Sequence, residues 1–157
     1  MPACGKSTFG VVLAKTLGMA FVDTDLLIQQ HTGKLLQALI DEDGMEVFLE
    51  EEEYILTHLQ AENTVIATGG SAVYSEKGME HLRSIGDIVY IRLPLEEIIR
   101  RLDNIKTRGI AMQPGEDLET LYRKRVPLYE KYADIILELE GMTLEESVSV
   151  FIGNYRQ

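Results

Sequence analysis

The sequence has little cysteine, no tryptophan and no long hydrophobic run. Cys4 is the only cysteine among the 157 residues, so no disulfide can form within the chain. The reducing cytoplasm is therefore the expected compartment. No apolar run approaches the roughly 18 residues of a membrane span, and no secretory leader is recognisable. We expect a cytoplasmic protein that does not associate with a membrane.

Basic residues are also scarce. The chain has 15 lysines and arginines against 26 acidic residues, which gives a formal net charge of -11. Such a charge repels a phosphate backbone, so a general nucleic-acid binder is not expected. Hydrophobic residues make up 45% and charged residues 26%, as in an ordinary globular protein. With no internal repeat or linker, residues 1–157 are expected to form a single domain, and we expect a monomer.

The histidines and the longest acidic run do not indicate a metal centre. His31, His58 and His81 lack cysteine or histidine partners at zinc spacing. Four consecutive glutamates at 50–53 resemble the charged face of an exposed helix. We expect this run to be solvated.

Helical and strand patterns alternate along the chain. Helical spacing of apolar residues predicts helices at 7–17, 45–59, 76–84, 95–103 and 118–132, whereas short β-rich runs predict strands at 20–22, 64–68, 88–93 and 134–139. Thr143 and Glu146 have capping-box spacing and predict a closing helix to Tyr155. The alternation predicts an α/β protein with three layers, α/β/α, around a central parallel sheet.

A phosphate-binding motif begins the first predicted helix. Gly5 allows the backbone to approach a ligand, Lys6 can reach terminal phosphates, and the Ser7 hydroxyl can bind magnesium. The helix N-terminus adds N–H groups and the positive end of its dipole. A chance Gly-Lys-Ser sequence that merely opens a helix is the alternative.

Part of the full phosphate-loop pattern is absent. The pattern G-x-x-x-x-G-K-[ST] requires a glycine one position before Met1, and the strand that normally feeds the loop would lie further upstream. Such a strand usually lies centrally, so its loss leaves N–H and C=O groups of its neighbours unpaired. We therefore expect the first strand to be missing from this chain and the 157 residues to be a fragment of a slightly longer one.

Polar and glycine residues follow two of the predicted strands. Asp23 and Asp25 end the first strand, and Gly69 and Gly70 follow the second. Ligands of open α/β sheets bind beyond the carboxyl ends of strands, so these residues are candidates for a site. The alternatives are an ordinary turn that caps the next helix, and a glycine turn without a ligand.

Taken in order, these motifs resemble the shikimate kinase family of P-loop kinases over nearly the whole chain. The matching residues are Gly5-Lys6-Ser7-Thr8, Asp23-Thr24-Asp25, Gly69-Gly70-Ser71, Arg108, and Arg125-Val126-Pro127-Leu128-Tyr129. The resemblance implies ATP and Mg2+ as cofactors. It implies that the loop residues Gly5, Lys6, Ser7 and Thr8 bind the nucleotide.

The resemblance also assigns roles around the acceptor. Asp23 would hold magnesium together with Ser7, Asp25 would accept a hydrogen bond from the reacting hydroxyl, and Gly69 and Gly70 would border the substrate. Arg125 would pair with a substrate carboxylate. Two more arginines complete the assignment: Arg101 would stack on adenine, and Arg108 would close over the transferred phosphoryl group. Because Arg108 lies in a stretch with Gly109, Pro114 and Gly115, residues 104–117 are a candidate mobile lid.

Three positions depart from the family pattern: Leu49, Ser71 where the turn usually has a third glycine, and Gly109 where proline usually follows the lid arginine. After Gly44 and Phe48 the family places a second carboxylate-binding arginine, where this chain has Leu49. Losing one arm of such a clamp costs about 1.5–3 kcal/mol of binding, or roughly 10- to 150-fold in affinity. The function that the resemblance implies first is still ATP-dependent phosphorylation of shikimate, although Leu49 weakens the case for that substrate. The alternatives are a kinase of another small hydroxylated metabolite and a non-catalytic nucleotide-binding module.

Overall fold

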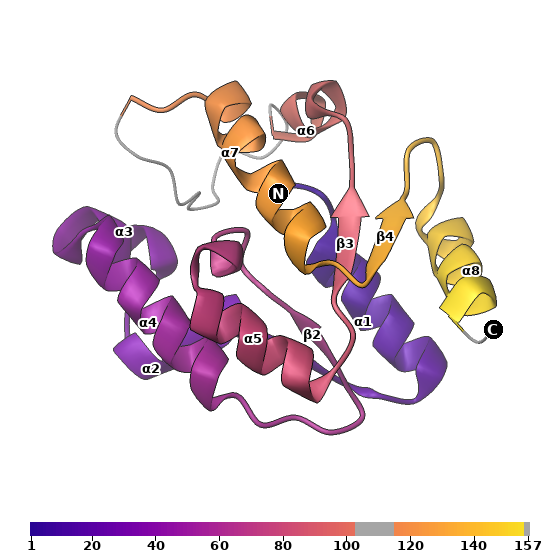
Figure 1. Ribbon diagram of the computed structural model, residues 1–157, viewed down its shortest axis with the longest axis horizontal. Coiled ribbons are helices and arrows are strands. Elements are labelled where there is room, and N and C mark those ends of the chain that lie inside the picture. Colours follow the sequence, from indigo (N-terminus) through magenta and orange to yellow (C-terminus); the bar gives the residue numbers. More distant parts are fainter. Residues whose placement is uncertain (103–114, 156–157) are drawn as a thin grey trace.

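The computed structural model describes residues 1–102 and 115–155, in which helices and strands alternate (Figure 1). In chain order the elements are α1 (Lys6–Leu17), β1 (Ala20–Asp23), α2 (Thr24–Thr32), α3 (Leu36–Asp43), α4 (Met45–His58), β2 (Thr64–Ala67), η1 (Ala72–Tyr74, a 3-10 helix), α5 (Glu76–Ile85), β3 (Val89–Arg92), α6 (Leu95–Leu102), α7 (Leu118–Tyr132), β4 (Ile135–Glu138) and α8 (Leu144–Tyr155). Every helix and strand predicted from the sequence is present, and no end is shifted by more than one residue.

The ends of two helices follow the chemistry expected from the sequence. Gly18 ends α1 in the left-handed conformation (φ 69°), and its N–H points back to the carbonyls of the last turn. At the start of α8 the Thr143 N–H donates to Glu146 (2.7 Å), and the Glu146 N–H donates to the Thr143 hydroxyl (3.2 Å). This reciprocal pair is the predicted capping box.

The strands form two parallel pairs instead of one continuous sheet. β1 pairs with β2 in the register Ala20–Thr64 to Asp23–Ala67, and β3 pairs with β4 in the register Val89–Ile135 to Arg92–Glu138. The parallel direction is the predicted one. Among the described residues, however, no strand joins β2 to β3.

A cavity lies between the two strand pairs. It has a volume of about 590 Å³ and is lined by residues of α1, β2, α5, β3, α7 and α8. Apolar side chains such as Val65, Ile91 and Tyr129 form much of its wall. The edges of β2 and β3 thus border an apolar space. The expectation that a further strand and a glycine belong before Met1 stays a prediction.

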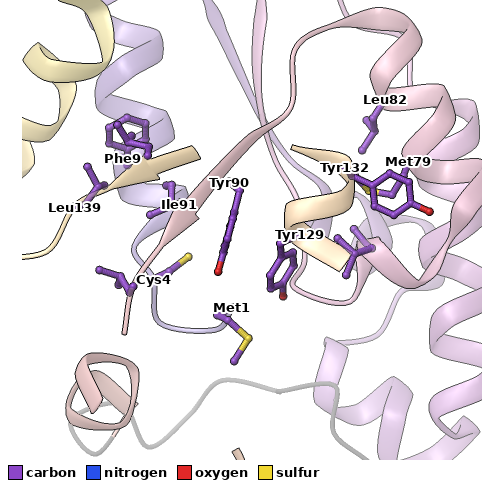
Figure 2. Packing of buried hydrophobic residues seen from close by; sticks show 14 of the residues in the cluster. Met1, Cys4, Phe9, Met79, Leu82, Tyr90, Ile91, Tyr129, Tyr132 and Leu139 are labelled. Carbon is purple, nitrogen blue, oxygen red and sulfur yellow. The ribbon is translucent and has the colours of Figure 1, made fainter. Parts of the chain in front are cut away.

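The hydrophobic residues form two clusters. The larger one joins α1, β3, α7 and α8 and contains Phe9, Tyr90 and Tyr129. Figure 2 shows Tyr90 and Tyr129 near Met1, and Phe9 on the other side of Ile91 beside Leu139. The smaller cluster holds α2, α3 and α4 together through Ile28, Leu39 and Phe48. The chain therefore builds a main core around the strands and a separate helical unit beside it.

The sequence patterns made no prediction for the residues that form α2 and α3. Asp23 caps α2, because its carboxylate accepts the N–H of Asp25 (3.0 Å), and Gly33 ends the helix in the left-handed conformation.

Of the candidate lid at 104–117, residues 104–114 lie outside the described residues. The remaining three lead into α7, whose first turn is capped by the Asp117 carboxylate accepting from Thr120 (2.7 Å). No helix in the described part of the chain has both the length and the apolar content needed to cross a membrane.

Candidate active site

The phosphate loop turns sharply into α1. Ala3 (φ 55°) and Gly5 (φ 82°) both adopt positive φ, and α1 begins at Lys6 with Gly5 at its N-cap. No side chain caps this helix end, so its first N–H groups are not used by a capping side chain. The loop therefore presents backbone N–H groups and a lysine at a helix N-terminus, which is an anion-binding arrangement. Thr8 lies in the same first turn.

Ser7 and Asp23 meet at the end of β1. The Ser7 hydroxyl donates to Asp23 Oδ2 at 2.8 Å, across 16 residues of sequence. Asp23 Oδ1 accepts the Asp25 N–H, so Asp23 is also an ordinary helix cap. Asp23 therefore has the capping role considered as an alternative and, in addition, a contact with the phosphate loop, while its role toward magnesium stays a prediction.

The end of β2 lies against the end of β1. The fully buried Thr24 hydroxyl accepts the N–H of Gly69 at 3.3 Å. A Cβ on Gly69 would lie 2.5 Å from Glu52 Oε1 and 2.9 Å from Asp25 Oδ1. A side chain at this position would therefore force one or both carboxylates to shift, so glycine leaves room for Asp25 and Glu52 to converge here.

The three basic residues at 123–125 divide into a solvated pair and a buried one. Arg123 pairs with Glu119 and Lys124 pairs with Glu116, each with an exposed basic side chain. Arg125 is only 2% exposed. A merely solvated basic run, considered as an alternative, therefore describes Arg123 and Lys124 but not Arg125.

Arg125 lies beside the glycine turn after β2. Its Nε donates to the Tyr74 hydroxyl at 3.2 Å, and its guanidinium lies 5.3 Å from the centre of the Tyr74 ring. A Cβ on Gly70 would be 2.9 Å from Arg125 Nη1, so this glycine also leaves room for the arginine. The Gly70 carbonyl accepts the Tyr129 hydroxyl at 2.7 Å. Burial raises the pKa of that hydroxyl, which keeps it a donor.

Tyr129 connects this turn to the core. Its ring stacks on Tyr90 of β3 with centroids 5.0 Å apart, and Figure 2 shows the two rings side by side. One face of α7 therefore supplies both Arg125 and the tyrosine that holds the backbone of Gly70 in place. The spacing of four residues puts the two side chains on the same face of the helix.

Glu52 is the residue that sequence reasoning missed. The glutamate run was expected to be solvated, but Glu52 is only 1% exposed, and the prediction is wrong at this position. Burial raises the pKa of its carboxyl to about 7, opposed in part by a hydrogen bond with Ser71. The overlooked signal is helical periodicity, since Phe48, Glu52 and Leu56 follow one another at intervals of four and are the buried residues of α4.

Three further positions were singled out from the sequence: Arg101, Leu49 and Arg108. Arg101 donates from Nε to Glu97 at 2.7 Å, and its Nη1 lies 3.7 Å from where a Cβ of Gly5 would be, so it borders the phosphate loop. Leu49 packs against the small cluster of α2, α3 and α4. Arg108 lies outside the described residues. Within the described residues, no group of three histidine, cysteine or acidic side chains is arranged to hold a metal.

Comparison with known proteins gives a consistent result. A family model described as "Shikimate kinase" matches residues 2–155. A shikimate kinase of Histophilus somni strain 2336 is 39% identical over 137 residues, which cover 85% of this chain and 78% of the relative.

Two solved structures share the fold. A shikimate kinase of Aquifex aeolicus matches with a TM-score of 0.84 and 29% identity, over 99% of this chain and 92% of that one. A shikimate kinase of Acinetobacter baumannii in complex with shikimate matches with a TM-score of 0.82 and 28% identity, over 98% of this chain and 88% of that one.

Proposed function

Because the chain belongs to the shikimate kinase family, we propose that it transfers the terminal phosphoryl group of ATP to a hydroxyl group of shikimate. One observation supports the acceptor assignment above the others. A buried arginine, Arg125, lies beside Gly70, and Asp25 lies beside the neighbouring Gly69, so this turn brings together a positive charge for a carboxylate and an acceptor for a hydroxyl. The relative from Acinetobacter baumannii that shares this fold is described with shikimate bound.

The nucleotide belongs at the phosphate loop. Gly5, Lys6, Ser7 and Thr8 would hold the phosphates through backbone N–H groups and the lysine ammonium, and Arg101, which borders Gly5, would contact the adenine side. ATP supplies the phosphoryl group. Positioning and positive charge are what this reaction asks of the protein, and Lys6 provides charge at the loop.

The residues at the loop also fit Mg2+. Ser7 Oγ and Asp23 Oδ2 lie 2.8 Å apart, and a hydroxyl and a carboxylate are the hard oxygen donors that this ion prefers. Few protein ligands are expected, since Mg2+ keeps several waters and shares phosphate oxygens. When bound, the ion neutralises charge on the phosphates.

The acceptor would lie between Asp25 and Arg125. Asp25 would orient the reacting hydroxyl of the acceptor and accept its proton. Arg125 would bind the carboxylate of the acceptor, and Gly69 and Gly70 would let the ring of the acceptor approach the backbone. Arg108 would stabilise the transferred group from the lid at 104–117. We further propose a single cytoplasmic domain that acts as a monomer, without a nucleic-acid or membrane partner.

A kinase of the same type with a different hydroxylated acceptor is the second candidate. It is favoured by Leu49, which packs in the apolar cluster of the small helical unit instead of offering a second cation to a carboxylate. Replacing Leu49 by arginine separates the two candidates. If shikimate is the substrate, the variant lowers the KM for shikimate about 10-fold or more; no improvement would indicate a pocket built for another acid.

The direct test identifies the product. The protein is incubated with ATP, Mg2+ and a panel of hydroxylated acids, and the phosphorylated compound is identified by mass spectrometry together with ADP release. Phosphorylated shikimate supports the proposal, and a different phosphorylated acid supports the second candidate. Nucleotide binding without any phosphorylated product would leave a non-catalytic binding module.

A further inference from the structure

Glu52 is a buried acid without a complete set of partners. It is 1% exposed, and its Oε1 atom has no hydrogen-bond partner among the described residues. A buried ionised carboxylate with an unsatisfied oxygen is costly, because it has lost its hydration and gained little in return. Either a proton or a nearby cation at Oε1 would lower the free-energy cost of burying this carboxyl group.

The charged groups around Glu52 come from several elements. Asp25 of α2 approaches the same point beside Gly69 and raises the cost of a second negative charge, whereas Arg125 of α7 and Lys6 of α1 lower it. Ser71 contributes a hydrogen bond.

Two lysines on or next to the helices that pack against α4 form ion pairs with acids other than Glu52. Lys77 of α5 pairs with Glu53, and Lys34, between α2 and α3, pairs with Glu42 and Asp43. In the described part of the chain no further cation is recorded as a partner of Glu52.

Leu49 is what leaves this acid without a cation on its own helix. It precedes Glu52 by three residues, and side chains at this spacing are neighbours on a helix. An arginine there would be an ion-pair partner, but the leucine packs into the cluster of Ile28, Leu39 and Phe48. The departure from the family pattern thus changes the electrostatics of a buried neighbour as well as the clamp itself.

We propose that Glu52 is a positioning residue of the acceptor pocket, which carries a proton in the substrate-free protein and thereby leaves the positive charge of Arg125 available to a carboxylate of the acceptor. The inference rests on the proposed function for the identity of that acceptor. Once ionised, Glu52 competes with the acceptor for Arg125 and adds a second negative charge beside Asp25. The raised pKa, about 7, agrees with this geometry and places the change near neutral pH.

The proposal makes the acceptor affinity depend on pH in a defined direction. Above the pKa of Glu52, the KM for shikimate rises by up to about tenfold for each pH unit, while kcat changes little. Glu52→Gln, which mimics the protonated form, keeps a low KM at pH 8. Glu50→Gln removes a charge from an exposed site on the same helix and serves as the matched control.

The experiment combines two measurements. The first is the titration of Glu52 in the substrate-free protein, followed by carboxyl 13C NMR in the original chain and in Leu49→Arg. The second is the pH profile of KM and kcat for the original chain, Glu52→Gln and Glu50→Gln. We expect Glu52 to titrate near 7, to titrate lower in Leu49→Arg, and Glu52→Gln alone to flatten the KM profile.

Two results would overturn the proposal: titration of Glu52 near the ordinary value of 4.5, or the same rise of KM with pH in Glu52→Gln as in the original chain. The NMR titration needs no substrate. Absence of shikimate turnover at every pH, with Glu52 titrating near 7, would therefore count against the proposed function and leave the protonation of Glu52 standing.

Discussion

The nucleotide end and the acceptor end of the candidate site are built differently. The nucleotide end is a short stretch of backbone, in which a left-handed glycine and a helix N-terminus present N–H groups to the phosphates. One carboxylate, that of Asp23 at the end of β1, contacts this loop through Ser7. The acceptor end is assembled from α2, α4, the turn after β2, and α7, with two ionisable side chains, Glu52 and Arg125, almost fully buried. The acceptor end departs from the family pattern at Leu49, which takes the place of a carboxylate-binding arginine.

This difference shows where specificity can change without loss of the reaction. A loop of backbone N–H groups tolerates few alterations, because its geometry binds the phosphates that every member of the reaction class uses. Buried charges respond to each neighbour, so one substitution such as Leu49 can alter the charge state of a pocket. We therefore expect variants of the two ends to separate catalysis from acceptor binding.

The largest effect is expected from Lys6→Met at the nucleotide end. Removing the ammonium takes away positive charge where it develops in the transition state, and we expect kcat to fall by about 10²- to 10³-fold. Affinity for shikimate, measured by calorimetry without nucleotide, should change little. A comparable loss of shikimate affinity would show that the two ends are not separable.

Arg125→Lys tests the acceptor end in the same way. Lysine keeps the charge but loses the planar fork, so we expect the KM for shikimate to rise about 10- to 100-fold. The dissociation constant of ATP should stay within about twofold. Steady-state kinetics and nucleotide titration measure the two quantities, and a matching loss of ATP affinity would contradict a role confined to the acceptor.

Gly69→Ala probes the point where the two carboxylates converge. The new methyl group would lie 2.5 Å from Glu52 Oε1, so side chains must shift, at a cost of about 1–3 kcal/mol in unfolding free energy. The KM for shikimate should rise as well. Gly86→Ala is the control, because its Cβ would meet no atom within 4 Å and its φ of 179° is extended backbone. Chemical denaturation that finds both variants equally stable would show that the packing around Gly69 is loose.

The last prediction concerns stability as a function of pH. The folded-state pKa of Glu52 is raised from 4.5 to about 7, so its contribution is fully present below pH 4.5 and is lost as pH rises through 7. At about 1.4 kcal/mol per pH unit, the loss amounts to at most about 3.5 kcal/mol. Relative to Glu52→Gln, the original chain should become less stable between pH 5 and pH 8. Denaturation curves at both values check this, and an unchanged difference would indicate that Glu52 stays ionised throughout.

The sequence was sufficient for the parts of the fold and site that depend on local patterns. Gly18, the capping box at Thr143 and the strand ends at Asp23 and before Gly69 all occur within one residue of where local chemistry predicts them. A missing central strand was expected to leave its neighbours unpaired, but which strands pair with each other was not predicted, because strand neighbours are decided by long-range packing.

The burial of Glu52 was likewise obscured by its three acidic neighbours in sequence. Its partners Asp25 and Arg125 are distant along the chain, so no local pattern brings the three together. Periodicity alone places Glu52 on the inner face of α4, but it does not reveal which charges it meets there.

The measurement that tests the account most directly is Mg2+-dependent ADP release in the presence and absence of shikimate, for the original chain and for Asp25→Asn. We predict release that requires shikimate, yields one phosphorylated shikimate per ADP, and falls at least about 100-fold in the variant. ADP release that is the same without shikimate, or that survives in Asp25→Asn, would contradict an acceptor site at the meeting point of α2, α4 and α7.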